Sequence, residues 1–398
     1  MEPMAVAAVK PAQEAPSAGI GALAERYDPD AIDLPGGAAR VRLQIDGDRV
    51  WDAVLTRRKL SLQAPRLDTR ADATLTADTA TWRQIAADVR GGMSAFRRGK
   101  LRIRGSLHVG VGFLAATSGA TEESRLTFES VRTRKAGRLS ILSAGAGKKT
   151  VICAHGLGGT KASFLPTVAA LAEHYRVVAV DLPGFGESDK PIGAPYNAPY
   201  FARSVFELMD ALDLEKAHLV GNSMGGRVVI EAGLMDEQRV ESLVLLSPAL
   251  AWLRDRRWAP IVKALRPELG LLQITPRPIV EGIVRRFVGA QGGWADAGID
   301  EFLRAYLNPR GRAAFYAAAR SIYLDEPHGQ NGFWTRMAEL APRSMFVWGR
   351  RDTLVPIAFM KHVEECLPAA KHVELECGHV PQLEAPRETH AAMRKFLG

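Results

Sequence analysis

The sequence predicts a doubly wound α/β domain with a mostly parallel sheet, preceded by a small α+β domain. Three observations support this prediction. Short apolar runs alternate with helix-like segments over residues 125–250 and 338–398, as in open parallel sheets. One of these runs ends at a glycine-flanked serine, Ser223, and a helix-like segment follows it. Residues 25–116 instead alternate apolar and polar side chains with period two, which is typical of a sheet with one solvent-facing side.

The parallel strands are expected at short apolar runs that are mostly rich in β-branched residues. These runs are 150–154, 177–180, 218–220, 242–246, 345–348 and 372–375. Segments 163–175 and 200–212 are expected to be helices between them. The alternating segments 125–130 and 138–142 suit an antiparallel hairpin at the edge of the same sheet. The whole of 125–398 is therefore expected to form one domain.

Residues 250–337 interrupt this alternation of strand and helix. They are helix-like and rich in apolar and arginine residues. The insertion follows the strand that ends near Ser247, where an inserted segment can cover the carboxyl ends of the sheet. We therefore expect a helical cap.

The first block is expected to be an antiparallel sheet with helices. Apolar residues alternate in the runs 41–45, 51–55, 60–62 and 73–77. A helix is expected over 81–89, a last strand over 100–104, and a further apolar segment over 107–114. Residues 1–24, of which the first 16 are rich in Ala and Pro, are expected to be a disordered tail, and 117–124 a polar linker.

Residues 25–116 also resemble a known family. Ala73-Thr74-Leu75-Thr76 precedes the segment that carries Trp82, and residues 91–105 have the sequence GGMSAFRRGKLRIRG. On these residues the block resembles the sterol-carrier-protein type of lipid-transfer fold. The resemblance implies a tunnel that binds a fatty acyl chain, a sterol or a similar lipid. The alternative is a packed α+β module that holds no ligand.

The serine at position 223 has the surroundings of a catalytic nucleophile. Gly221 and Gly225 flank it in a G-x-S-x-G turn between a strand and a helix, the pattern of a nucleophile elbow. Small residues at these two positions let the strand and the helix approach closely. The sharp turn would lift the Ser223 hydroxyl out of the fold, where a substrate can reach it.

A serine nucleophile needs a base, and the base needs a carboxylate that fixes its tautomer. His379 follows the last expected strand, and Asp352 follows the strand before it. Both would lie at carboxyl ends of strands, where open α/β sheets place their sites. The chain order of Ser223, Asp352 and His379 is also that of α/β hydrolases.

The turn after the strand that ends at Ala154 is the expected oxyanion hole. It can direct the backbone N–H of Leu157 at a developing negative charge, with the N–H of Met224 as second donor. His155 and Gly156 are expected to support this loop. Asp181 is a carboxylate in a neighbouring turn, but it lies before the serine, out of order for a catalytic acid.

These motifs together resemble the α/β-hydrolase family over residues 125–398. Serine at position 223 departs from the branches that use aspartate there, the epoxide hydrolases and haloalkane dehalogenases. The resemblance is to serine esterases, lipases and carbon–carbon bond hydrolases. A dinucleotide fingerprint at Gly156 and Gly158 is rejected because Lys161 stands in place of its third glycine.

The sequence therefore predicts a serine hydrolase that cleaves carboxylic esters of a lipophilic substrate through an acyl-enzyme. Hydrolysis of a carbon–carbon bond is the first alternative, and cap arginines could then bind a substrate carboxylate: Arg254, Arg256, Arg257, Arg285 and Arg286. Perhydrolysis with the same residues is a second alternative. A lipid-binding or lipid-transfer protein with a secondary hydrolase domain is a third.

Composition limits the remaining classes. The formal charge is +8, but the basic residues form no aromatic-interleaved tract, so no nucleic-acid partner is expected. Peripheral contact with an anionic membrane is compatible with this charge. Three cysteines and no Cys/His cluster of zinc spacing argue against a disulfide framework, and no metal or cofactor is expected. With no signal peptide recognised, a soluble, cytoplasmic protein is expected.

Overall fold

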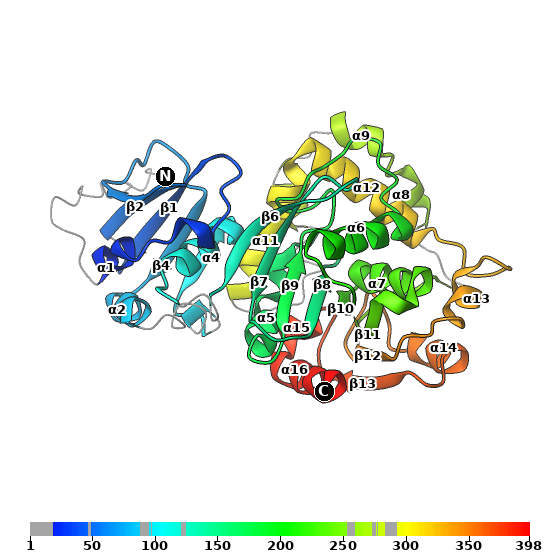
Figure 1. Cartoon of the computed structure of the whole chain (residues 1–398). Coiled ribbons are helices and arrows are strands. Elements are labelled where there is room, and N and C mark those ends of the chain that lie inside the picture. The colour runs from blue at the N-terminus through cyan, green and yellow to red at the C-terminus, as the bar shows by residue number, and fades with distance from the viewer. Residues whose placement is uncertain are drawn as a thin grey trace. The chain divides into compact units, whose positions relative to one another are not determined.

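The computed structural model describes residues 19–46, 49–87, 95–96, 98–120, 125–252, 259–272, 276, 278–282 and 293–398. The chain divides into two compact units. The first comprises residues 1–127 together with 292–300, and the second comprises 128–291 and 301–398. Each unit is built on its own sheet (Figure 1).

The first unit contains a five-stranded sheet in the order β3-β2-β1-β4-β5. Its strands are β1 (Ala38–Ile45), β2 (Arg49–Thr56), β3 (Leu60–Gln63), β4 (Ala73–Ala77) and β5 (Arg102–Gly105). Burial alternates along β1 and β4, because successive side chains of a strand point to opposite faces. The period-two pattern thus identified these strands correctly.

The expectation of an antiparallel sheet is wrong at one pairing. β1 pairs with β4 in parallel, with Leu43 opposite Leu75, whereas the other described pairings of this sheet are antiparallel. After β3 the chain crosses to the free side of β1, so β4 runs in the same direction as β1. Periodicity reports which face a residue occupies but not the direction of its neighbour.

Helices α1 (Ile20–Glu25), α2 (Thr79–Ala87) and α4 (Leu107–Ala116) also belong to the first unit. The tail assigned to residues 1–24 extends too far, since Ile20 and Leu23 are buried in α1. Burial of these two apolar side chains orders the α1 segment, whereas its composition alone had suggested disorder. Much of the glycine-rich stretch used for the family resemblance, residues 91–94, lies outside the described residues.

The second unit contains an eight-stranded sheet in the order β13-β12-β11-β10-β8-β9-β7-β6. Its strands are β6 (Thr127–Arg132), β7 (Arg138–Ala144), β8 (Thr150–Ala154), β9 (Arg176–Val180), β10 (Ala217–Asn222), β11 (Val240–Leu246), β12 (Ser344–Gly349) and β13 (Lys371–Leu375). Strands β8 to β13 are parallel, and β7 pairs antiparallel with β9. The predicted parallel strands and the edge position of 125–130 and 138–142 are confirmed.

Helices cover both faces of this sheet (Figure 1). On one side are α5 (Leu165–Leu171), α15 (Pro381–Glu384) and α16 (Pro386–Leu397); on the other are α6 (Ala198–Ala211) and α7 (Met224–Met235). The segment expected as one helix over 163–175 is instead the 3-10 turn η2 (Lys161–Phe164) followed by α5. Buried apolar residues, many of them β-branched, fill strands β8 to β12 between the two helix layers, as in other doubly wound sheets.

The expected cap is helical. It contains α8 (Ala259–Ala264), α9 (Pro267–Leu272), α11 (Gly293–Leu307), α12 (Pro309–Tyr323) and α13 (Phe333–Met337). The expectation that all of it groups with the hydrolase block is wrong for 292–300, which belong to the first unit. There Asp300 accepts from Arg104 Nε at 2.7 Å and from the Gly105 N–H at 2.9 Å. The cap arginines named as carboxylate ligands lie outside the described residues.

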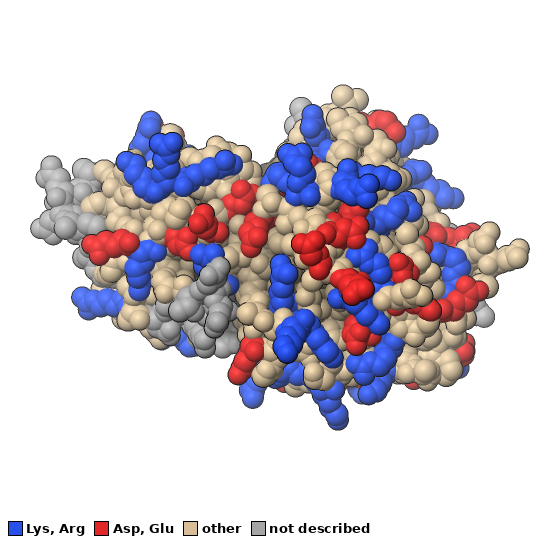
Figure 2. Space-filling model, viewed as in Figure 1, with Lys and Arg blue, Asp and Glu red and all other residues tan. Residues whose placement is uncertain are grey.

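The surface carries charges of both signs. On the face shown in Figure 2, Lys and Arg side chains are interspersed with Asp and Glu over the second unit.

Among the described helices, none combines the length and the apolar composition needed to cross a bilayer.

Candidate active site

Ser223 lies at the turn between β10 and α7 in an uncommon backbone conformation. Its φ is 54° and its ψ is −116°, a combination that costs a non-glycine residue about 1–3 kcal/mol. The turn is held by its neighbours: the Ser223 N–H donates to the Leu246 carbonyl at 3.0 Å, and the Ala249 N–H donates to the Ser223 carbonyl at 2.8 Å. The serine is therefore fixed against the end of β11 and is half-buried.

The glycines of the elbow are required by backbone contacts. A Cβ added to Gly225 would lie 2.0 Å from the Ala154 carbonyl oxygen, at the end of β8. A Cβ added to Gly221 would lie 2.2 Å from the Gly225 carbonyl oxygen. Since backbone cannot move aside as a side-chain tip can, both positions exclude larger residues. The predicted reason for the two glycines is confirmed.

His379 and Asp352 lie at the carboxyl ends of β13 and β12 and contact each other directly. His379 Nδ1 lies 2.8 Å from Asp352 Oδ2. The other carboxylate oxygen, Oδ1, accepts from the N–H groups of Leu354 and Val355 at 2.8 and 2.9 Å. The Asp352 side chain is fully buried, and that of His379 is 16% exposed. An acceptor-only carboxylate at Nδ1 places the proton there and leaves Nε2 free to act as a base.

Two residues that the sequence analysis did not single out hold the histidine loop. Asn222, directly before Ser223, donates from Nδ2 to the His379 carbonyl at 3.1 Å and to the Leu246 carbonyl at 2.9 Å. Glu384 on α15 accepts from the N–H groups of Gly378 and Val380 at 2.7 and 2.9 Å. The elbow and the histidine loop are thus joined directly. Sequence spacing carries no signal for Asn222, and only the short helix after His379 could have suggested Glu384.

The loop after β8 lies beside the serine. A Cβ on Gly156 would be 3.2 Å from Ser223 Cβ, so the loop and the elbow are in close contact. Within the part of the chain that the structure describes, the N–H groups of Leu157 and Met224 have no protein acceptor. Two unused amide donors beside a serine are what an oxyanion hole requires.

His155 supports this loop through both ring nitrogens. The Leu182 N–H donates to His155 Nε2 at 3.0 Å, so the ring proton is on Nδ1, which lies 2.8 Å from the Gly156 carbonyl. Burial lowers the pKa of the imidazole and keeps it neutral. Both ring nitrogens of His155 therefore contact backbone groups, one in this loop and one in the turn after β9.

Aromatic cap residues pack on the same loop. A Cβ on Gly158, whose φ is 74°, would lie 2.5 Å from the ring of Phe302 and 3.2 Å from that of Phe315. The two rings meet edge to face, with centroids 5.6 Å apart. The loop of the oxyanion candidates is therefore bordered by apolar surface.

Comparison with known proteins agrees with this architecture. Residues 149–386, more than half of the chain, match the alpha/beta hydrolase fold family, and residues 23–115 match the SCP-2 sterol transfer family. The chain therefore belongs to the alpha/beta hydrolase fold family and carries an N-terminal domain of the sterol-transfer type.

Two of the similar curated proteins have different activities. The dihydrolipoyllysine-residue acetyltransferase component of the acetoin cleaving system of Cupriavidus necator is 31% identical over 269 residues, covering 64% of this chain and 65% of that protein. The match thus spans just under two thirds of that relative. A 2-hydroxy-6-oxononadienedioate/2-hydroxy-6-oxononatrienedioate hydrolase of Cupriavidus pinatubonensis is 28% identical, covering 66% of this chain and 91% of that protein.

A solved structure shows the same fold. A hydrolase from Pseudomonas aeruginosa has a TM-score of 0.55 and 25% identity, and the match covers 69% of this chain and 98% of that one. The likeness covers a share of the chain similar to that matched by the relatives.

The elbow contact predicts an asymmetry between two glycines of α7. Gly225→Ala should destabilise the second unit by about 3 kcal/mol or more, because the new methyl group meets backbone. Gly233→Ala should change stability by less than about 1 kcal/mol, since its nearest neighbour is the tip of Leu340, 2.9 Å away. Urea unfolding of the full chain measures both. Equal stability of the two variants would contradict the close approach at Gly225.

Proposed function

We propose that the second unit is a serine hydrolase in which Ser223, His379 and Asp352 form a catalytic triad. The observation that carries the proposal is the 2.8 Å contact between His379 Nδ1 and Asp352 Oδ2, on a loop joined to the elbow through Asn222. Its support is chemical: a strained, half-buried serine, an oriented imidazole and a buried carboxylate are the three roles that acyl transfer needs.

The proposed reaction follows from these roles. The Ser223 hydroxyl attacks the carbonyl carbon while His379 Nε2 takes its proton, and the N–H groups of Leu157 and Met224 bind the oxyanion. His379 then returns the proton to the leaving alcohol, which leaves an acyl-enzyme. Water activated by the same imidazole releases the acid. Asp352 holds the tautomer and stabilises the imidazolium.

We propose carboxylic esters with a substantial apolar group as the substrates. Phe302 and Phe315 border the oxyanion loop, so the group next to the scissile carbonyl would meet aromatic surface. The sterol-transfer domain on the same chain supports the same preference. We propose that this domain binds a fatty acyl chain, a sterol or a similar lipid, because it matches the SCP-2 sterol transfer family.

Hydrolysis of a carbon–carbon bond is the second candidate. Its support is the similarity to a 2-hydroxy-6-oxononadienedioate/2-hydroxy-6-oxononatrienedioate hydrolase. The match covers 91% of the length of that protein. The same triad would serve, with a carbanion equivalent as leaving group in place of an alcohol.

Removing the nucleophile or the base tests the triad. Ser223→Ala and His379→Ala should each lower kcat for a p-nitrophenyl ester by about 10⁴ or more, because attack and proton transfer act as one unit. Ser223→Ala should also abolish labelling by a fluorophosphonate probe. The control is Ser163→Ala, a serine on η2 whose hydroxyl donates to the Thr160 carbonyl. Unchanged turnover in Ser223→Ala would place the nucleophile elsewhere.

A substrate panel separates the two candidate reactions. We expect kcat/KM for p-nitrophenyl esters to rise with acyl length, by up to about tenfold for each well-buried pair of methylenes. Turnover of a vinylogous diketone acid should be at least 100-fold weaker by the same measure. The reverse order would favour carbon–carbon hydrolysis, and product formation only with hydrogen peroxide would favour perhydrolysis.

The lipid proposal is tested on the full chain. Protein purified under native conditions should retain a fatty acid or sterol in stoichiometric amount, detected by solvent extraction and mass spectrometry. Ser223→Ala should retain the same lipid, since its substitution lies in the other unit. A lipid-free protein that also fails to bind a fluorescent fatty acid would support a packed module without a ligand.

A further inference from the structure

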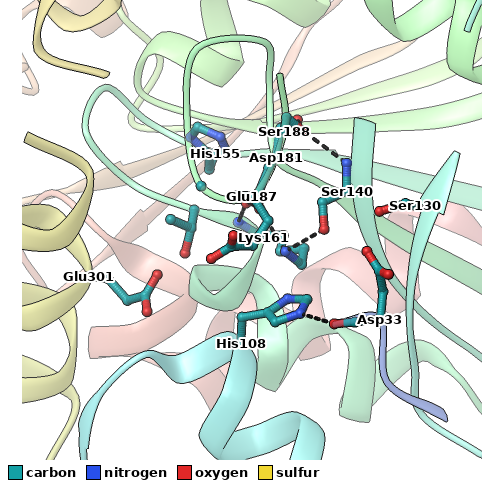
Figure 3. Close-up of polar contacts among 12 residues, drawn as sticks. Asp33, His108, Ser130, Ser140, His155, Lys161, Asp181, Glu187, Ser188 and Glu301 are labelled. Atoms are coloured by element: carbon teal, nitrogen blue, oxygen red, sulfur yellow. Dashed lines mark hydrogen bonds and ion pairs between the residues drawn. The ribbon is translucent and has the colours of Figure 1, made fainter. Parts of the chain in front are cut away.

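A buried ion pair joins the two loops beside the candidate oxyanion hole. Lys161 Nζ lies 2.6 Å from Asp181 Oδ2, and the two side chains are 2% and 0% exposed. Lys161 follows the oxyanion turn, and Asp181 directly follows β9. Figure 3 shows the two side chains directed at one another, with Ser140 beside the ammonium group, 3.0 Å from Nζ.

The Asp181 carboxylate accepts three hydrogen bonds, and both of its oxygens take part. Oδ1 accepts from the backbone N–H of Lys161 at 2.7 Å, and Oδ2 accepts from the backbone N–H of Glu187 at 2.9 Å as well as from Nζ. Burial by itself would raise the pKa of Asp181, but the ammonium group and these donors hold it at about 2. The group is therefore ionised throughout the physiological range.

The oxyanion turn is anchored at both ends on the same segment. At its start, His155 accepts from the Leu182 N–H at 3.0 Å. At its end, the Lys161 N–H donates to Asp181. The turn 156–160, which includes the Leu157 amide, is thus fixed at both ends by hydrogen bonds to the adjacent residues 181 and 182.

A fully buried charge pair is a costly way to stabilise a fold. Replacing such a pair by well-packed apolar groups of similar volume is often neutral or stabilising, whereas removing one partner costs about 3–5 kcal/mol. Stability alone therefore does not account for an ion pair at this position. A fixed loop geometry does, because a charged carboxylate that binds three donors holds them more tightly than a neutral group.

We propose that Lys161 and Asp181 are positioning residues for the oxyanion hole: the pair fixes the turn 156–160 so that the Leu157 amide meets the oxyanion. This inference rests on the proposed serine hydrolase activity. Neither residue touches the reacting atoms, and both act through the loop backbone.

The turn that carries Asp181 also forms ion pairs with the cap. Glu187, whose N–H binds Asp181, pairs through its side chain with Arg304 on α11, and Arg304 also pairs with Glu301 at 3.1 Å. Burial by itself would lower the pKa of Arg304, but the two carboxylates raise it. The 181–188 turn therefore contacts the oxyanion loop on one side and a cap helix on the other.

The test compares Lys161→Met with the double variant Lys161→Met/Asp181→Asn. The single variant should be less stable, because it leaves a buried carboxylate without its cation. The double variant removes both charges and should regain part of the thermal midpoint, although the amide introduced at position 181 can accept from only one of the Lys161 and Glu187 N–H groups through its oxygen. In both, kcat should fall by about 10- to 100-fold while KM changes less than threefold, since only transition-state binding is lost.

A trifluoromethyl ketone inhibitor reports on the hole itself. Addition of the Ser223 hydroxyl to its carbonyl gives a bound oxyanion, so its Ki should rise by the same factor as kcat falls. Lys216→Met is the control. Lys216 lies 3.4 Å from Glu241 in an exposed ion pair that involves neither the oxyanion turn nor residues 181–188. It should leave kcat and Ki within about twofold of the wild type.

The outcomes separate the two proposals. A double variant that recovers stability but keeps a low kcat and a raised Ki supports a positioning role. Recovery of stability, kcat and Ki together overturns it and leaves a purely structural pair, even if Lys161→Met itself fails to fold. A wild-type protein without turnover or Ser223-dependent labelling would overturn the proposed function, and this inference with it.

Discussion

The close backbone contact at the elbow is the constraint on which the site depends. Gly225 of α7 packs against the Ala154 carbonyl at the end of β8, and Gly221 packs against Gly225 itself. This contact sets the direction of α7, the strained conformation of Ser223 and the separation of the elbow from the loop after β8. Strain of about 1–3 kcal/mol at one residue persists because the parallel sheet on both sides holds the turn.

Polar groups at the ends of adjacent strands then complete the arrangement. The parallel strands bring the loops that carry Ser223, Asp352 and His379 to one edge, where Asn222 links two of them. Each buried charge in this region is paired or accepts several N–H groups, as burial requires. Asp352 accepts two backbone N–H groups as well as the imidazole, which keeps the carboxylate from turning away from His379.

Local pattern reasoning succeeded where one residue type has one physical explanation. Glycines on both sides of a serine, between a strand and a helix, are explained by an elbow alone. Asp352 follows the buried strand β12, and His379 follows β13. Such reasoning failed where contacts with distant parts of the chain determine the structure. The parallel pairing of β1 with β4 depends on where the chain crosses after β3. The burial of Ile20 in α1 depends on the partner surface, which composition does not report.

The sequence by itself determined the fold family, the strands of both sheets and the three candidate catalytic residues, because each is encoded in short-range periodicity or in residues at strand ends. Only the tertiary structure decided how those residues are held. Asn222 contacts His379 across 157 positions, and Lys161 contacts Asp181 across 20. Such contacts depend on distances and directions that arise once the strands are aligned. They leave no periodic signal in the chain. The sequence therefore did not indicate that Lys161 pairs with Asp181, and only the structure shows this contact.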